Sequence, residues 1–181
     1  MPRVLKGLPC RSETDDLQWR FDANEFKRWC EGMTGYPIVD AGMRQLNDYG
    51  WASHRIRSIT SQFLTKHLLI DWRFGERYFM KQSIDADFAL NNAGWQWGAF
   101  TGPSTQPTSW RFSPTSQGKS FNSSGDWIKK YVPELTTANK TEVHEPWKSP
   151  TPFLNYPAPL VNPEQAILRF SVFYKAIPWK K

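Results

Sequence analysis

The stretch Ile84-Asp-Ala-Asp-Phe-Ala-Leu-Asn-Asn-Ala-Gly-Trp-Gln-Trp-Gly-Ala-Phe100 decides how the rest of the chain is interpreted. Within it Asp87, Asn91 and Trp95 recur at a spacing of four, so in an α-helix they share one face, with Asp85 just before the first turn. A carboxylate and an amide on a buried face need hydrogen-bond partners, which a heteroaromatic ligand would supply. The alternative is that the two aspartates cap a helix and that the tryptophans pack in the core.

The run from Asp85 to Trp97 resembles the flavin-contacting segment of the DNA photolyase and cryptochrome family. The resemblance continues through Thr34-Gly-Tyr-Pro-Ile-Val-Asp-Ala-Gly-Met-Arg44, Phe63-Leu-Thr-Lys66, Leu69-Ile-Asp-Trp-Arg73, Gly75-Glu-Arg-Tyr-Phe79 and Val132-Pro-Glu-Leu135. It spans the chain from Trp19 to the C-terminus, and motifs of this length rarely match by chance. It implies an all-α fold: a helical bundle like the FAD-binding domain of these proteins, with long irregular loops.

The domain organisation follows from where the resemblance stops. Residues 1–16 are polar, lack hydrophobic periodicity and lie outside the resemblance, so we expect a non-matching tail there and a partial FAD-binding domain over residues 17–181. A full-length family member also carries an N-terminal α/β antenna domain, the first helices of the flavin domain and a loop that holds the cofactor's phosphates. The chain therefore resembles the C-terminal part of such a protein.

Composition narrows the class of protein. With 181 residues, 39% of them hydrophobic, the chain fits one domain with its own core. No apolar run approaches the roughly 18 residues that span a bilayer, and the N-terminus lacks the apolar core of a secretory signal, so an intracellular soluble protein, cytoplasmic or nuclear, is expected. Two cysteines and three histidines form no metal-ligand pattern. The net charge of +6 suits a polyanionic partner such as DNA.

Caps, stops and apolar spacing predict the helices. They are expected over 22–32, 37–50 and 53–70, after a cap at Asp71, through the flavin-contacting segment, and over 126–132 and 162–177. Residues 101–118 are rich in Pro, Ser, Thr and Gly and predict a long loop, and 138–159 predict an extended strap. No stretch alternates with a period of two for long enough to predict a sheet.

The resemblance implies FAD as the cofactor and assigns residues to it. Arg57 and Asp85 match the family's ion pair beside the isoalloxazine ring, and Asp87 and Asn91 match further cofactor-binding positions. Such a pair can stabilise a negative flavin through the arginine; the alternative is an ordinary salt bridge between helices. Asn91 matches the residue that faces the flavin's redox-active nitrogen, where an amide can donate or accept a hydrogen bond.

Three tryptophans match the path that carries an electron from the protein surface to the oxidised flavin. They are Trp95, Trp72 and Trp19. Indole rings are readily oxidised, which suits them to this transfer. The alternative for each residue taken alone is core packing.

Four residues match the family's lesion-binding cavity or depart from it. Trp97 matches the tryptophan that stacks on the damaged bases, and Arg55 matches an arginine that contacts the damaged strand. His54 stands where dimer-repairing members have asparagine; it is also expected at the cofactor, and a histidine there is the proton donor of the enzymes that repair (6-4) photoproducts. Ser58 replaces an apolar methionine of the cavity.

A further departure lies in a loop that the family places near DNA. This chain has Trp110-Arg-Phe-Ser-Pro114 where dimer-repairing members have Arg-Ile-Phe-Asn-Pro. The change removes an arginine and an asparagine, so we expect weaker binding to DNA with a flatter salt dependence.

Three functions remain open from the sequence. The first is light-driven, FAD-dependent splitting of pyrimidine dimers in damaged DNA, which is the carbon-carbon lyase reaction of a deoxyribodipyrimidine photolyase. The second is a cryptochrome-like blue-light photoreceptor, and the third is an inactive truncated flavin-domain fragment. A separate N-terminal antenna-domain chain is a potential partner in the first two cases.

Overall fold

The protein is described by a computed structural model that covers residues 3–103 and 112–177. Within these ranges it has eight α-helices and no strand, with one isolated parallel bridge between Arg20 and Ile70. The all-α prediction is confirmed.

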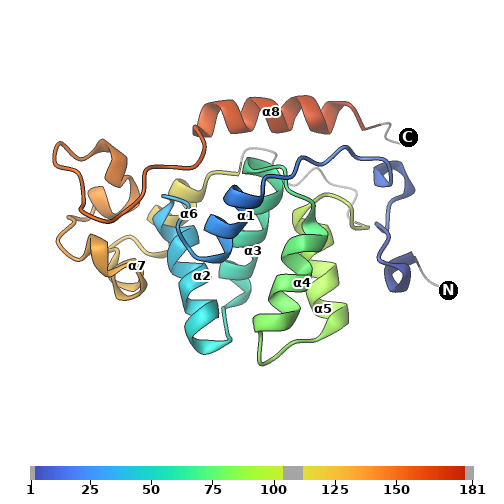
Figure 1. Cartoon of the computed structure of the whole chain (residues 1–181), viewed down its shortest axis with the longest axis horizontal. Coiled ribbons are helices and arrows are strands. Elements are labelled where there is room, and N and C mark those ends of the chain that lie inside the picture. Colours follow the sequence, from blue (N-terminus) through green and yellow to red (C-terminus); the bar gives the residue numbers. More distant parts are fainter. Residues whose placement is uncertain (1–2, 104–111, 178–181) are drawn as a thin grey trace.

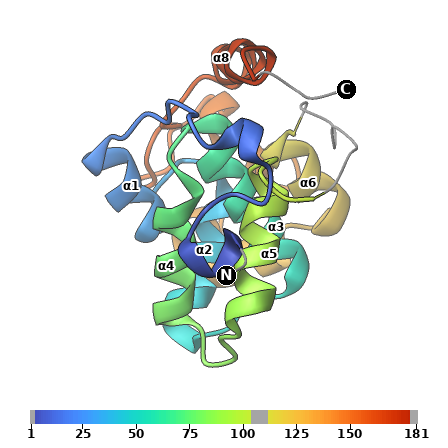
Figure 2. The ribbon, with the colours of Figure 1, turned by 90° about the vertical axis from the view of Figure 1, so that its right-hand side faces the viewer.

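The helices have the following bounds: α1 Ala23–Cys30, α2 Pro37–Tyr49, α3 His54–Gln62, α4 Trp72–Gln82, α5 Phe88–Gly98, α6 Pro114–Phe121, α7 Asp126–Tyr131 and α8 Pro163–Lys175. Short 3₁₀ turns occur at Arg3–Lys6, Ser12–Thr14, Pro133–Leu135, Glu142–His144 and Pro146–Lys148, and a π-helical turn, η3, at Phe63–His67. In Figure 1 the helices α2 to α5 stand side by side, and α8 crosses one end of them. Figure 2 shows the same arrangement with α8 seen end-on.

Several helix boundaries lie where the sequence predicted them, for the physical reasons expected. The Asp22 side chain accepts hydrogen bonds from the Asn24 and Glu25 backbone at 2.9 Å, and Asp71 accepts one from the Arg73 backbone at 3.0 Å. At the other end of α2, Gly50 has a φ of 65°, the left-handed conformation that ends a helix.

Two predicted elements differ. The helix expected over 53–70 stops being α-helical at Gln62, passes through η3 and ends where Leu69 has a φ of 53°. The region 101–118, predicted as loop throughout, contains the start of α6, which Ser113 caps and Pro114 opens. Residues 104–111 of that region lie outside the described ranges.

Residues 3–16, expected as a polar tail, contact the helical body. The Cys10 backbone N–H donates to Gln96 Oε1 at 2.7 Å, and Arg11 N–H donates to the Thr101 carbonyl at 3.1 Å. Arg73 Nε donates to the Gly7 carbonyl at 2.8 Å. The segment thus connects to both α4 and α5.

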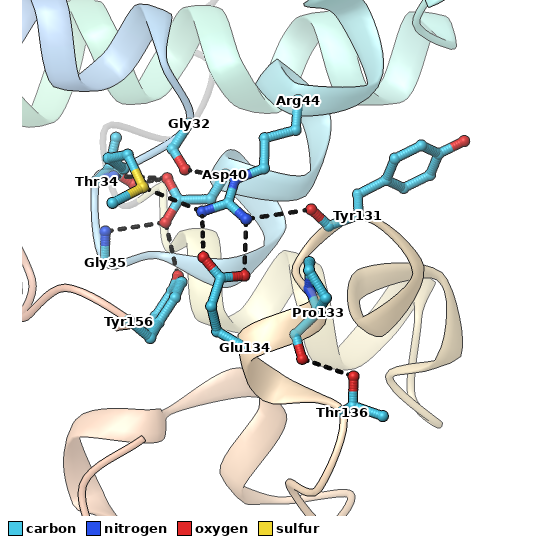
Figure 3. Close-up of polar contacts among 11 residues, drawn as sticks. Gly32, Thr34, Gly35, Asp40, Arg44, Tyr131, Pro133, Glu134, Thr136 and Tyr156 are labelled. Carbon is cyan, nitrogen blue, oxygen red and sulfur yellow. Dashed lines mark hydrogen bonds and ion pairs between the residues drawn. The ribbon is translucent and has the colours of Figure 1, made fainter. Parts of the chain in front are cut away.

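A buried carboxylate fixes the start of α2 (Figure 3). Asp40, which is 0% exposed, accepts hydrogen bonds from Thr34 N at 2.7 Å, Thr34 Oγ1 at 2.6 Å, Gly35 N at 3.0 Å and the Tyr156 hydroxyl at 2.6 Å. Four donors offset part of the loss of hydration that a buried charge suffers, although burial still raises the pKa of Asp40 above its usual value. The bond from Tyr156 also fastens the segment that the sequence predicted as a strap.

One turn further along α2, Arg44 holds the 3₁₀ turn Pro133–Leu135 in place (Figure 3). Its guanidinium binds both oxygens of Glu134, at 2.8 and 3.0 Å, and donates to the Tyr131 carbonyl at 3.3 Å. Burial raises the pKa of Glu134, but its hydrogen bonds with Arg44 outweigh that effect and hold the pKa below its usual value. This fork-shaped pair joins α2 to the chain after α7.

The core lies where α1 to α5 meet. Its largest fully buried side chains include Trp29, Trp72, Phe63 and Phe79. No helix in the described ranges is long and apolar enough to cross a membrane.

Replacing Tyr156 by phenylalanine should lower the free energy of unfolding by about 1.5–3 kcal/mol, because a buried charged acceptor loses one of its four donors. Urea unfolding followed by tryptophan fluorescence measures this. The matched control is Tyr49→Phe, since Tyr49 is 59% exposed and should tolerate loss of its hydroxyl. Equal effects of the two substitutions would contradict the importance of the Asp40 cluster.

Candidate functional site

A pocket of about 560 Å³ lies between α3 and α5. Its volume falls in the range of small-molecule and cofactor sites, which is roughly 300–1,000 Å³. It is lined by Trp51, Ala52, His54, Arg57, Ser58, Ser61, Phe79, Asp85, Asp87, Leu90, Asn91, Ala93, Gly94, Trp95 and Trp97. Eight of the eleven residues that the sequence assigned to a site are among them.

The two walls of the pocket are helices that run side by side in the same direction. Arg57, early in α3, is joined to Asp85, which precedes α5. Near the other ends of these helices, a Cβ at Gly98 would lie only 3.0 Å from Ser61 Oγ. Since the starts are adjacent and the ends are adjacent, both helix N-termini point to the same end of the pocket, where they favour negative charge.

The end of the pocket near these N-termini is ionic. Arg57 Nη2 donates to Asp85 Oδ1 at 2.6 Å, and Arg57 Nε donates to the Ala52 carbonyl at 2.8 Å. The second bond goes to an uncharged acceptor, so it orients the guanidinium without neutralising its positive charge. Asp85 keeps a half-exposed side chain, so the pair faces the open pocket and is not an internal salt bridge alone.

Asp87 and Asn91 each make one side-chain hydrogen bond within the protein. Asp87 is the N-cap of α5, where its side chain accepts a hydrogen bond from Leu90 N at 2.8 Å. Asn91 Nδ2 donates to the Glu76 carbonyl at 2.9 Å. A backbone carbonyl can only accept, so the amide nitrogen must face α4. The Asn91 oxygen is therefore the atom free to accept a hydrogen bond from a ligand.

The α5 wall of the pocket is bare at its centre. A Cβ placed on Gly94 would meet no atom within 4 Å, so the backbone faces open space there. Leu90, Ala93 and Trp97 continue the same face at helical spacing. An apolar wall without side chains at its middle fits a flat ring, and the free oxygen of Asn91 and the Arg57 guanidinium supply the polar contacts that such a ring needs.

The three tryptophans of the expected path differ in burial, and Trp95 is the one that lines the pocket. Trp95 lines it and packs so closely on α4 that a Cβ at Gly75 would lie 2.1 Å from its ring. Trp72 starts α4 and is fully buried, while Trp19 is half-buried and lies 5.0 Å from the ring of Phe173 on α8.

Of the four residues expected to bind the lesion, Trp97, His54 and Ser58 line the pocket. Trp97 is 41% exposed, and His54 is the first residue of α3. Arg55 does not line it: its guanidinium lies over the exposed ring of Phe121 at 4.3 Å. The substituted residues Trp110 and Arg111 lie outside the described ranges.

Other residues of the pocket wall were not among the predicted site residues. On α5 these are Leu90, Ala93 and Gly94, which share the spacing of three and four residues that leads to Trp97. That spacing could have identified them. Trp51 and Phe79 come from other elements, and no local pattern marks them. Among the described residues no three His, Cys, Asp or Glu side chains gather as a metal site.

The fold and the pocket define a helical domain with a cofactor-sized pocket whose walls suit a flat ring with polar edges. The sequence pattern of the family described as the FAD binding domain of DNA photolyase matches residues 2–176. The chain belongs to this family, and FAD is the cofactor for which the family is named.

The individual proteins and solved structures that resemble this chain are photolyases and a cryptochrome. The deoxyribodipyrimidine photo-lyase of Escherichia coli K12 is 47% identical over 178 residues, which is 97% of this chain and 38% of that protein. A class III photolyase from Agrobacterium tumefaciens superposes with a TM-score of 0.91 at 41% identity, over 98% of this chain and 38% of that one. A Synechocystis cryptochrome reaches a TM-score of 0.82 at 30% identity, over 88% of this chain and 35% of that one. The chain thus spans less than two fifths of the length of these relatives.

Two glycines of the site should respond in opposite ways to the same substitution. Gly94→Ala should raise the free energy of unfolding by about 0.5–1 kcal/mol, because alanine is the better helix former and the added methyl group meets nothing. Gly75→Ala should lower it by about 1–3 kcal/mol, because the methyl group would overlap the Trp95 ring. Urea unfolding of both variants tests this, and a destabilised Gly94→Ala protein would show that the pocket wall is not open.

Proposed function

We propose that this chain forms the catalytic part of a light-driven DNA repair enzyme, a deoxyribodipyrimidine photolyase that splits pyrimidine dimers. The observation that supports this most is a single pocket that brings together Arg57, Asp85, Asn91 and Trp95 in a chain of the photolyase family. The reaction class is that of a carbon-carbon lyase.

FAD fits the pocket by the chemistry of its walls. The Arg57 guanidinium balances negative charge on a bound flavin, with Asp85 keeping the pair neutral overall. The Asn91 oxygen accepts a hydrogen bond from the ring edge, and the bare backbone at Gly94 leaves space for the ring itself. When bound and excited by light, FAD supplies the electron that opens the dimer; the protein holds the cofactor and substrate close and excludes water.

Trp95, Trp72 and Trp19 are proposed to carry an electron inward when the cofactor is oxidised. Their burial supports this order, from the pocket wall through the core to a half-exposed site. Indoles buried in this way are shielded from side reactions with solvent.

Damaged DNA is the proposed substrate, flipped into the open end of the pocket. Trp97 offers a broad exposed face for stacking there, and the net charge of +6 favours a phosphate backbone. Arg55 is proposed to act outside the pocket, on the strand rather than on the lesion. If damaged DNA is the substrate, the protein acts in the compartment that holds the genome.

The start of α5 exposes large apolar side chains, with Ile84 at 81% and Leu90 at 77%. Surfaces of this kind are usually covered by protein. The relatives are longer than this chain, so we propose that a polypeptide corresponding to their remaining length, including an antenna domain, covers this face and completes the cofactor site. It is either joined to this chain or a separate one.

A blue-light photoreceptor is the second candidate. The observation that favours it is the position of Arg55, which is expected to contact the damaged strand but lies apart from the pocket. The likeness to the Synechocystis cryptochrome is compatible with it.

The repair test supplies the purified chain with chemically reduced FAD and an oligonucleotide that carries one cyclobutane thymine dimer. We expect blue light, and not darkness, to restore the bases, as measured by chromatography of the oligonucleotide. Failure with flavin bound would favour the photoreceptor. If this chain alone takes up no flavin, repeating the test with the remaining polypeptide added distinguishes an incomplete cofactor site from an inactive fragment.

Trp95→Phe should abolish photoreduction of bound, oxidised FAD while leaving its affinity unchanged within about twofold, because phenylalanine keeps the packing but resists oxidation. The bleaching of the blue flavin absorbance under illumination, with an added reductant, measures this. Trp127→Phe, on α7 and away from the pocket, is the matched control. Undiminished photoreduction in the Trp95 variant would remove the tryptophan path.

A further inference from the structure

Ser58, Gln62 and Lys66 lie four residues apart and form a row along α3 into η3. Side chains at this spacing are neighbours on a helix. Ser58 lines the pocket, whereas Gln62 and Lys66 are buried behind it. The row therefore runs from the protein interior to the pocket wall.

The hydrogen bonds in this row have a fixed direction. Lys66 Nζ donates to Gln62 Oε1 at 2.5 Å, and Gln62 Nε2 donates to Ser58 Oγ at 3.0 Å. An ammonium group can only donate, so the Gln62 oxygen must face Lys66 and its NH₂ group must face Ser58. Lys66 makes no salt bridge within the described residues; its other contacts include the ring face of Phe100 at 4.2 Å.

Other hydroxyls of the same stretch behave differently from Ser58. Thr60, Ser61 and Thr65 donate to helix carbonyls three or four residues earlier, at 3.0, 3.1 and 2.9 Å. Ser58 Oγ instead accepts from Gln62, and across residues 3–103 and 112–177 it makes no bond as a donor. Its hydrogen is thus left for a group in the pocket.

We propose that Ser58 is a substrate-positioning residue whose hydroxyl donates to a carbonyl oxygen of a pyrimidine ring, aimed there by Gln62 and Lys66. The inference rests on the proposed function. Pyrimidine rings of a dimer carry carbonyl oxygens, which suit a single hydroxyl donor. The row lies toward the end of α5 that bears Trp97, because Gln62 Cγ is 3.7 Å from where a Cβ of Gly98 would be.

The buried cation strengthens the donor at the pocket wall. In a chain of hydrogen bonds each bond polarises the next, and the effect is larger where water is excluded. Burial lowers the pKa of Lys66 to about 7, so the ammonium form and the direction of the row are secure below that pH.

The test measures binding of the FAD-saturated chain at pH 6 to an oligonucleotide with one cyclobutane thymine dimer and to its undamaged counterpart. Ser58→Ala should weaken binding of the dimer about three- to tenfold, the loss of one neutral hydrogen bond, without affecting undamaged DNA or FAD. Thr136→Ala is the matched control. The Thr136 hydroxyl also donates to a carbonyl of its own turn, that of Pro133, but it is exposed and outside the pocket lining, so its loss should leave the dimer's affinity unchanged.

A second measurement tests the row itself without any ligand. The side-chain NH₂ resonances of Gln62 in an NMR spectrum should shift in Ser58→Ala and in Lys66→Met, and stay in place in Thr136→Ala. Gln62→Leu should reproduce the loss of dimer affinity.

Three outcomes would overturn the inference. Equal dimer binding by Ser58→Ala and the wild type would show that the hydroxyl does not contact the lesion. A loss of FAD affinity in that variant would show that it faces the cofactor instead. A wild-type chain that binds FAD without preferring the dimer would refute the proposed function as well.

Discussion

The parallel alignment of α3 and α5 is the constraint on which the site depends. Arg57 and Asp85 join the two helices at their starts, and the absence of a side chain at Gly98 lets them approach near their ends. Together these contacts fix the spacing of the two helices near both ends of the groove between them. Because both N-termini meet at one end, that end favours negative charge, while the other end carries hydroxyls and an indole.

Two polar residues of the pocket bond within the protein through one side-chain atom and leave another for a ligand. Asn91 donates to α4 and retains its oxygen, and Ser58 accepts from Gln62 and retains its hydrogen. Residues fixed in this way are oriented before a ligand arrives, so less ordering is needed when it binds. Farther from the pocket, the Asp40 cluster and the Arg44 fork anchor α2 and the chain that follows α7.

Local sequence predicted several helix starts and the all-α class, and the family resemblance supplied eight of the fifteen residues that line the pocket. Asp22, Asp71 and Pro37 act within one turn of their own positions, so short patterns suffice to place them. The break of α3 at η3 was missed because it depends on the tertiary packing around Lys66 and Leu69. The direction of the hydrogen bonds from Lys66 through Gln62 to Ser58 could not be predicted from the sequence either. It depends on the burial of the Lys66 ammonium group, which residue spacing does not show.

The central claim is that the groove between α3 and α5 receives the flavin ring, and quenching of flavin fluorescence on titration with the protein tests it most directly. The wild-type chain should quench FAD saturably, and Gly94→Leu should lower the affinity at least tenfold, because its side chain would fill space that is empty in the folded protein. Val172→Leu on the exposed face of α8 should bind as the wild type does. Equal quenching by Gly94→Leu and the wild type would place the flavin elsewhere and contradict the account.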